Sequence, residues 1–122
     1  MNAQSSGPDP AVFDSEQFRN NLESDELMKT LIDLFSEESE SYLTQAEVAL
    51  EQQDGEALHR AAHALKGLLG NYAAERALEK ASHMVKLAKE SSLEQAEGVF
   101  TDCREEIENL HAALIDFGKA LE

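Results

Sequence analysis

The sequence predicts an all-α protein, an antiparallel up-down four-helix bundle with a short extra N-terminal helix. The chain has 122 residues, of which 42% are hydrophobic, and this is enough for one modest core. It contains only two Pro and no Trp, and its many Ala, Leu and Glu residues favour helices. Apolar residues recur at helical spacing in segments joined by short connections, which makes successive helices antiparallel neighbours.

The N-terminal end divides into an arm and the start of the domain. Residues 1–12 are small, polar and marked by Pro and Gly, so we expect a disordered arm. Residues 13–122 then form the helical domain. Asp14, followed three residues later by Gln17, resembles a capping box and begins the short extra helix.

A long second helix follows and runs to about residue 52. Ser24 and Asp25 are suited to its first turn because their side chains can accept hydrogen bonds from backbone N–H groups there. The positions expected in the core recur at helical spacing: Leu27, Leu31, Leu34, Phe35, Tyr42, Ala46, Ala49 and Leu50.

Three further helices complete the predicted bundle. Asp54 is a candidate N-cap for a helix running to about residue 71, and a fourth helix covers about residues 75–89. Ser92 with Gln95 forms another capping-box pattern, which begins a last helix ending near residue 119. The fourth helix has apolar positions at Leu78, Ala81, Val85 and Leu87 or Ala88. The last helix has them at Phe100, Cys103, Ile107, Leu110, Leu114, Phe117 and Leu121.

Charge and cysteine content restrict the class of function. The net charge is −15, which argues against nucleic acid as a partner because binding it needs a basic surface. Residues 60–89 are the exception, with six basic and two acidic side chains. The single cysteine, Cys103, permits no intramolecular disulfide and suits a reducing compartment. No apolar run approaches membrane-spanning length and the start has no signal pattern, so we expect a cytoplasmic protein without a membrane partner.

One face of the third predicted helix carries an unusual set of residues. The core stripe of this helix comprises Leu58, Ala62, Leu65, Leu69 and Tyr72. At about 100° per residue, His63 points roughly 140° away from that stripe. His59, Lys66, Gly67 and Gly70 lie beside it on successive turns. Each glycine costs the helix about 1 kcal/mol relative to Ala, so a plain core helix does not explain the pair.

These residue types suit phosphoryl chemistry. An exposed imidazole keeps an unprotonated ring nitrogen at neutral pH, which makes His63 a competent nucleophile. The Lys66 ammonium, one turn away, can stabilise a phosphoryl group as a point charge. The missing side chain at Gly67 lets another surface approach closely. The face therefore predicts phosphoryl acceptance on His63.

The segment "AHALKGLLGNYAA", residues 62–74, resembles the histidine-containing phosphotransfer (HPt) domain family, whose core motif is His-x-x-Lys-Gly. The resemblance covers about residues 13–120. It implies a four-helix bundle that carries a phosphoryl group between aspartates of receiver domains, in response regulators or hybrid sensor histidine kinases. It makes His63 the phosphoacceptor, Lys66 the electrostatic stabiliser and Gly67 the clearance residue. It implies a monomeric carrier without its own cofactor or ATP-binding kinase domain, with Mg²⁺ supplied by the receiver.

The segment departs from the family pattern after the glycine. Leu68 and Leu69 stand where small residues, often Ser, are usual, and Ala73 occupies the position of a later Gly. We expect an exposed Leu68 to influence which receiver docks. The other expected docking residues are His59, Arg60 and Gly70.

Two other classes of function are possible from the sequence. One is a helical interaction module without phosphotransfer. The other is a metal-binding bundle, because Glu56-x-x-His59 and Glu108-x-x-His111 match an element of di-iron proteins. Glu56 and His59 fall on the outer face of their helix, which argues against a core metal site. His59 and His63 are spaced to share a transition metal, but no third ligand is apparent, so we predict no metal site.

Overall fold

The computed structural model describes residues 9–22 and 24–121, and over these residues the protein has five helices and no strand. The predicted all-α class is confirmed. None of the helices in this part of the chain is both long and apolar enough to pass through a lipid bilayer. The helices are α1 (Ser15–Asn21), α2 (Asp25–Glu51), α3 (Gly55–Leu69), α4 (Glu75–Lys89) and α5 (Leu93–Ala120).

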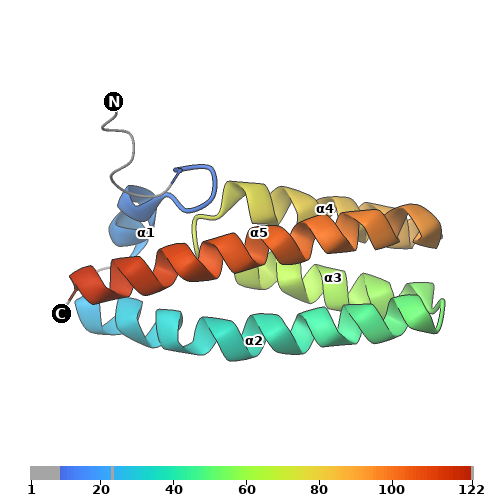
Figure 1. Cartoon of the computed structure of the whole chain (residues 1–122), viewed down its shortest axis with the longest axis horizontal. Coiled ribbons are helices and arrows are strands. Elements are labelled where there is room, and N and C mark those ends of the chain that lie inside the picture. Colours follow the sequence, from blue (N-terminus) through green and yellow to red (C-terminus); the bar gives the residue numbers. More distant parts are fainter. Residues whose placement is uncertain (1–8, 23, 122) are drawn as a thin grey trace.

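The four longer helices pack around a common core. Contacts join α2 to α3, α3 to α4, α4 to α5 and α5 back to α2, so the four form a closed ring. Figure 1 shows them side by side, with α1 at the end where α2 begins and α5 finishes. Phe18 of α1 is fully buried there, with its ring 5.7 Å from that of Phe117 on α5. The short helix therefore closes one end of the bundle.

Three of the four predicted helix caps form. The side chains of Asp14, Ser24 and Asp54 each accept a hydrogen bond from the backbone N–H three residues later. These bonds satisfy donors that the first helical turn leaves unpaired. Ser92 stands at the N-cap position of α5 as predicted, but its side chain makes no such bond. The backbone N–H of Asp14 donates to the Ala73 carbonyl, at 2.9 Å. This hydrogen bond connects the start of α1 to the segment between α3 and α4.

The core face of α2 differs from the predicted one. Leu27 and Leu34 were expected inside, yet each is 45% exposed. The buried line is shifted by about one residue along the helix, and it comprises Met28, Ile32, Phe35, Ser39, Leu43, Ala46, Ala49 and Leu50. Ser39 is tolerated there because its hydroxyl donates to the Ser36 carbonyl at 3.3 Å. A helix with apolar residues on two adjacent stripes does not itself reveal which stripe its neighbours cover.

The predicted core faces of α3 and α5 are confirmed. The stripe of α3 and the following Tyr72 have no exposed surface, and the middle of the α5 stripe is equally buried. The Tyr72 hydroxyl donates to the Leu31 carbonyl of α2 at 2.7 Å, so this buried polar atom is paired. Burial raises the pKa of Tyr72 to about 12, and the negative charge of Glu38 adds to that effect.

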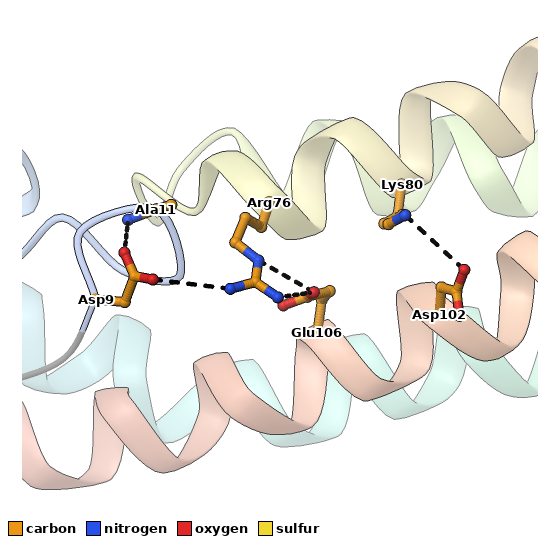
Figure 2. Close-up of polar contacts among 6 residues, drawn as sticks. All are labelled: Asp9, Ala11, Arg76, Lys80, Asp102 and Glu106. Atoms are coloured by element: carbon orange, nitrogen blue, oxygen red, sulfur yellow. Dashed lines mark hydrogen bonds and ion pairs between the residues drawn. The ribbon is translucent and has the colours of Figure 1, made fainter.

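The last part of the predicted N-terminal arm contacts the bundle. Residues 1–8 lie outside the described residues, but 9–12 form a turn that is attached to the bundle. The Ala11 carbonyl accepts a hydrogen bond from the backbone N–H of Arg76, at 2.9 Å. Asp9 accepts from the Ala11 N–H and lies 3.8 Å from the Arg76 guanidinium (Figure 2). These contacts hold residues 9–12 against α4, so the disordered arm expected over residues 1–12 does not extend over this stretch.

Candidate functional site

The outer face of α3 consists of His59, His63, Lys66, Gly67 and Gly70. His63, Lys66 and both glycines are accessible at the surface, and His59 is half-buried. The predicted site residues therefore lie together on one accessible helix surface. Tertiary packing produces this placement because the opposite side of α3 is fully buried between its neighbouring helices.

Leu68 does not belong to this surface. It was expected to be exposed, but only 9% of it is accessible and it belongs to the hydrophobic core. Leu68 follows the buried Ala61 by two turns and Leu65 by three residues, so it lies on the broad buried side of α3. The prediction that Leu68 selects the docking partner through an exposed side chain was wrong.

The two glycines of the outer face differ in their surroundings. A Cβ added at Gly67 would have no atom within 4 Å, so nothing in the fold requires glycine there. A Cβ at Gly70 would lie 3.5 Å from the Gly67 carbonyl and 3.6 Å from the Lys66 carbonyl, which is ordinary contact. Gly70 ends α3 with φ −61°, a conformation open to any residue. It is therefore not the left-handed C-cap that its position would allow.

The residue with a left-handed backbone conformation at this end of α3 lies three positions after Gly70. Ala73 has φ 52°, a backbone conformation that is unfavourable for residues with a Cβ. It forms the turn between α3 and α4, where its carbonyl accepts the Asp14 N–H. The sequence contained a signal for this, because Ala73 stands where the HPt pattern often has glycine. The left-handed turn therefore accounts for the glycine that is frequent in the family at this position, because glycine adopts this backbone conformation without steric cost.

The imidazole of His63 has one close aromatic neighbour. Its ring lies parallel to that of His59, with an interplanar angle of 1° and 6.2 Å between the ring centroids. Within residues 9–22 and 24–121, neither ring takes part in a hydrogen bond. The His63 ring is therefore held by no polar partner in this part of the chain and is open to an incoming group.

The basic residues of segment 60–89 divide into paired and unpaired groups. Three of them face carboxylates: Arg60 lies 3.7 Å from Glu56, Arg76 lies 2.6 Å from Glu106, and Lys80 lies 3.8 Å from Asp102. Figure 2 shows that the last two pairs join α4 to α5. Among the described residues, Lys66 makes no ion pair. Its ammonium therefore remains available next to His63.

Cys103, the other nucleophilic side chain, is not part of this surface. It lies in the core on α5. Burial raises the pKa of its thiol to about 12, the negative charge of Glu106 adds to the rise, and Lys80 opposes it. A neutral, enclosed thiol is unreactive at neutral pH, so Cys103 is not a candidate nucleophile.

The di-iron alternative has no support in the geometry. The part of the chain that the structure describes holds no group of three or more His, Cys, Asp or Glu side chains placed to bind a metal ion. His111, one of the residues of the Glu-x-x-His pattern, is half-buried and its ring stacks on Phe35 with 6.1 Å between centroids. The pattern at Glu108 and His111 therefore reflects helix packing and the abundance of glutamate.

The protein is an all-helical bundle with an accessible histidine, an open glycine and a lysine without an ion pair in the described residues, all on one helix. A family model described as Hpt domain matches residues 30–113. This match spans more than half of the chain, and the chain therefore belongs to the Hpt domain family. Its family function is histidine phosphotransfer in two-component phosphorelays, as a carrier rather than a kinase. Neither the curated proteins nor the solved structures contain a match.

Proposed function

We propose that this protein is a phosphorelay intermediate that accepts a phosphoryl group on His63 from the aspartyl phosphate of one receiver domain and passes it to another. The observation that carries the proposal is the exposure of His63 beside a free cation and an open glycine. The family match supports phosphotransfer as the general activity. The assignment to His63 rests on its place in the His-x-x-Lys-Gly motif and on its accessibility.

The proposed transfer is a direct displacement at phosphorus. The lone pair of an unprotonated His63 ring nitrogen, Nε2 by analogy with the family, attacks the phosphorus in line with the bond to the aspartate oxygen. An N–P bond forms as that P–O bond breaks, and the aspartate leaves as a carboxylate with the bonding electrons. The reverse displacement by the carboxylate of a second receiver regenerates free His63.

Lys66 and Gly67 assist this displacement in different ways. The Lys66 ammonium stabilises the charge on the equatorial phosphoryl oxygens in the transition state. Gly67 carries no side chain, and a Cβ added there would have no atom within 4 Å, so the receiver has room to bring its phosphorylated aspartate to His63. His59, Arg60 and Gly70 lie around these residues and contribute to the receiver-docking surface.

The remaining parts of the proposal concern the partners. The receivers belong to response regulators, a hybrid sensor histidine kinase or both, and they supply the Mg²⁺. The carrier acts as a monomer in the cytoplasm, with no cofactor of its own. Its four long helices form the antiparallel up-down bundle typical of the family, and the ring of helix contacts supports that topology.

A phosphotransfer assay tests the site. The 122-residue chain is incubated with a receiver domain carrying ³²P on its aspartate, in the presence of Mg²⁺. We expect label that is stable to base and labile to acid, as for phosphohistidine, and its complete loss in His63→Gln. His83→Gln is the matched control, because His83 is also exposed but lies on α4.

Two outcomes would contradict the proposal. If His63→Gln accepts phosphate at the rate of the native chain, the assignment of the site is wrong. If the native chain accepts no phosphate from any of a panel of receivers, the chain is an interaction module rather than a carrier. Transfer of the label from the isolated phosphorylated chain to a second receiver tests the relay step.

A further inference from the structure

The outer face of α3 presents two histidines as a pair rather than one alone. We propose that His59 and His63 together bind a divalent transition-metal ion of the Zn²⁺, Cu²⁺ or Ni²⁺ type. Imidazole nitrogens are suitable ligands for these ions. The two side chains are four residues apart, so they project from consecutive turns of the same helix face.

The geometry of the pair requires only a small adjustment. The ring planes are parallel within 1° and their centroids are 6.2 Å apart. A zinc ion holds each ligating nitrogen at about 2.0–2.1 Å, which brings two such nitrogens to within about 4 Å of each other. A tilt of the two rings toward each other achieves this, and no hydrogen bond within the described residues opposes it.

The charges around the pair come from both signs. Glu56 lies one turn before His59, and its carboxylate is 3.7 Å from Arg60, a highly exposed pair that separates at little cost. His59 also lines a surface hollow together with Glu56 and Lys89. Lys66 lies one turn beyond His63 and opposes a cation. The two histidines are the ligands and Glu56 provides electrostatic attraction. Water takes the place of the third protein ligand whose absence led us to predict no metal site from the sequence.

Metal binding and phosphoryl acceptance would compete for the same electron pair. A coordinated His63 nitrogen has no lone pair left to attack phosphorus. The bound ion would thus inhibit transfer until it dissociates. This consequence rests on the proposed function, whereas the binding of the metal does not.

Zinc titration of the 122-residue chain tests the binding. Zn²⁺ affinity is measured by competition with a chromophoric chelator, with matched single-histidine variants. We expect binding to weaken at least tenfold in both His59→Ala and His63→Gln, because each leaves a single imidazole. His83→Ala and His111→Ala remove histidines outside the pair and should retain the native affinity. Far-UV circular dichroism verifies that each variant keeps its helices.

Nuclear magnetic resonance locates the ion independently. Diamagnetic Zn²⁺ should shift the imidazole signals of His59 and His63 together, at the same metal concentration. The proposal is overturned if His59→Ala binds Zn²⁺ as tightly as the native chain. It is also overturned if the affinity falls in His83→Ala or His111→Ala instead, or if only one of the two paired rings shifts.

Transfer assays with and without Zn²⁺ separate this proposal from the previous one. We expect Zn²⁺ to slow phosphorylation of the native chain by a larger factor than that of His59→Ala, each compared with its own metal-free rate. Equal factors would show that the inhibition arises in the receiver and would refute the competition. A chain that binds Zn²⁺ through both histidines but accepts no phosphate would refute the proposed function alone.

Discussion

The α4–α5 seam and the outer face of α3 both contain charged residues from the same chain, yet they use them in opposite ways. At the seam, Arg76 donates two hydrogen bonds, of 3.1 and 2.6 Å, to one oxygen of Glu106, whose side chain is only 9% exposed. On the outer face, His63 and Lys66 are accessible and make no side-chain hydrogen bond or ion pair within the described residues. The charged side chains of the seam connect two helices, whereas the side chains of His63 and Lys66 are not engaged within the described residues.

The contrast teaches how to separate structural from functional charge in this protein. Six basic residues lie between Arg60 and Lys89, and the sequence does not distinguish them. The structure pairs Arg76 and Lys80 with carboxylates of α5, whereas Lys66, on the same helix face as His63, makes no ion pair within the described residues. Because buried charges must be paired while surface charges need not be, the two groups should respond differently to substitution.

Arg76→Ala should have the largest effect on stability. The substitution leaves the nearly buried Glu106 carboxylate without a cationic partner. The other oxygen of this carboxylate, Oε1, already has no hydrogen-bond partner within the described residues. We expect the free energy of unfolding to fall by about 3 kcal/mol, measured by urea denaturation. The double variant Arg76→Met/Glu106→Leu should recover most of the loss, because an apolar pair can replace a buried ion pair. A loss below about 0.5 kcal/mol, typical of an exposed pair, would remove the distinction between the two regions.

Ala73→Gly should stabilise the connection between the regions. Ala73 has φ 52°, and glycine removes the steric cost of its Cβ in that conformation. We expect a gain of about 1 kcal/mol in thermal or urea unfolding. Ala112→Gly, the same change at an exposed position within α5, should instead cost about 1 kcal/mol. A loss of stability in Ala73→Gly would contradict the assigned conformation.

Gly67→Ala should stabilise the outer face and leave the fold intact. A Cβ there has no atom within 4 Å, so the gain in helix propensity is up to about 1 kcal/mol. The larger Gly67→Leu should weaken receiver binding in a titration because it fills the approach to His63. Gly98 on α5 has equally open surroundings, so Gly98→Leu is the matched control. Equal receiver affinity for the two leucine variants would exclude the clearance role of Gly67.

Lys66→Ala should have the smallest effect on stability. An accessible lysine in the last turn of α3 contributes below about 0.5 kcal/mol through the helix dipole. Phosphoryl transfer, followed by the rate of label appearance on His63, should nevertheless slow about tenfold, which corresponds to about 1.4 kcal/mol in the barrier. Lys86→Ala provides the control, since Lys86 occupies the last turn of α4. A rate equal to that of the control would remove Lys66 from the mechanism.

The sequence predicted most of the helices because their signals are local. The acceptors Asp14, Ser24 and Asp54 mark three helix starts correctly. Ser92 also marks the start of α5, but its side chain makes no capping hydrogen bond, because a capping pattern permits such a bond without requiring it. The core side of α3 was predicted correctly because its apolar residues form a single, well-defined stripe.

Predictions that depended on neighbouring helices were less successful. Leu27 and Leu34 proved exposed because the neighbours of α2 cover a different arc of that helix from the predicted one. Leu68 proved buried because the neighbours of α3 cover a wider arc than the predicted stripe. Hydrophobicity alone does not indicate how wide that arc is. Residues 9–12 looked disordered for a related reason, because their hydrogen-bond partner Arg76 lies far along the chain.

The sequence by itself therefore determined the helical class, the caps of three helices and the position of His63, Lys66 and Gly67 on one face, because a 3.6-residue period requires only local information. The tertiary structure alone decided which basic residues of α4 pair with α5 and that Leu68 is inside. It also assigned the left-handed conformation to Ala73, for which the sequence carried only the glycine that is frequent in the family. These properties depend on contacts between segments distant in sequence. The parallel rings of His59 and His63 combine the two levels, since the helix sets their spacing and the bundle leaves His63 exposed and His59 half-buried.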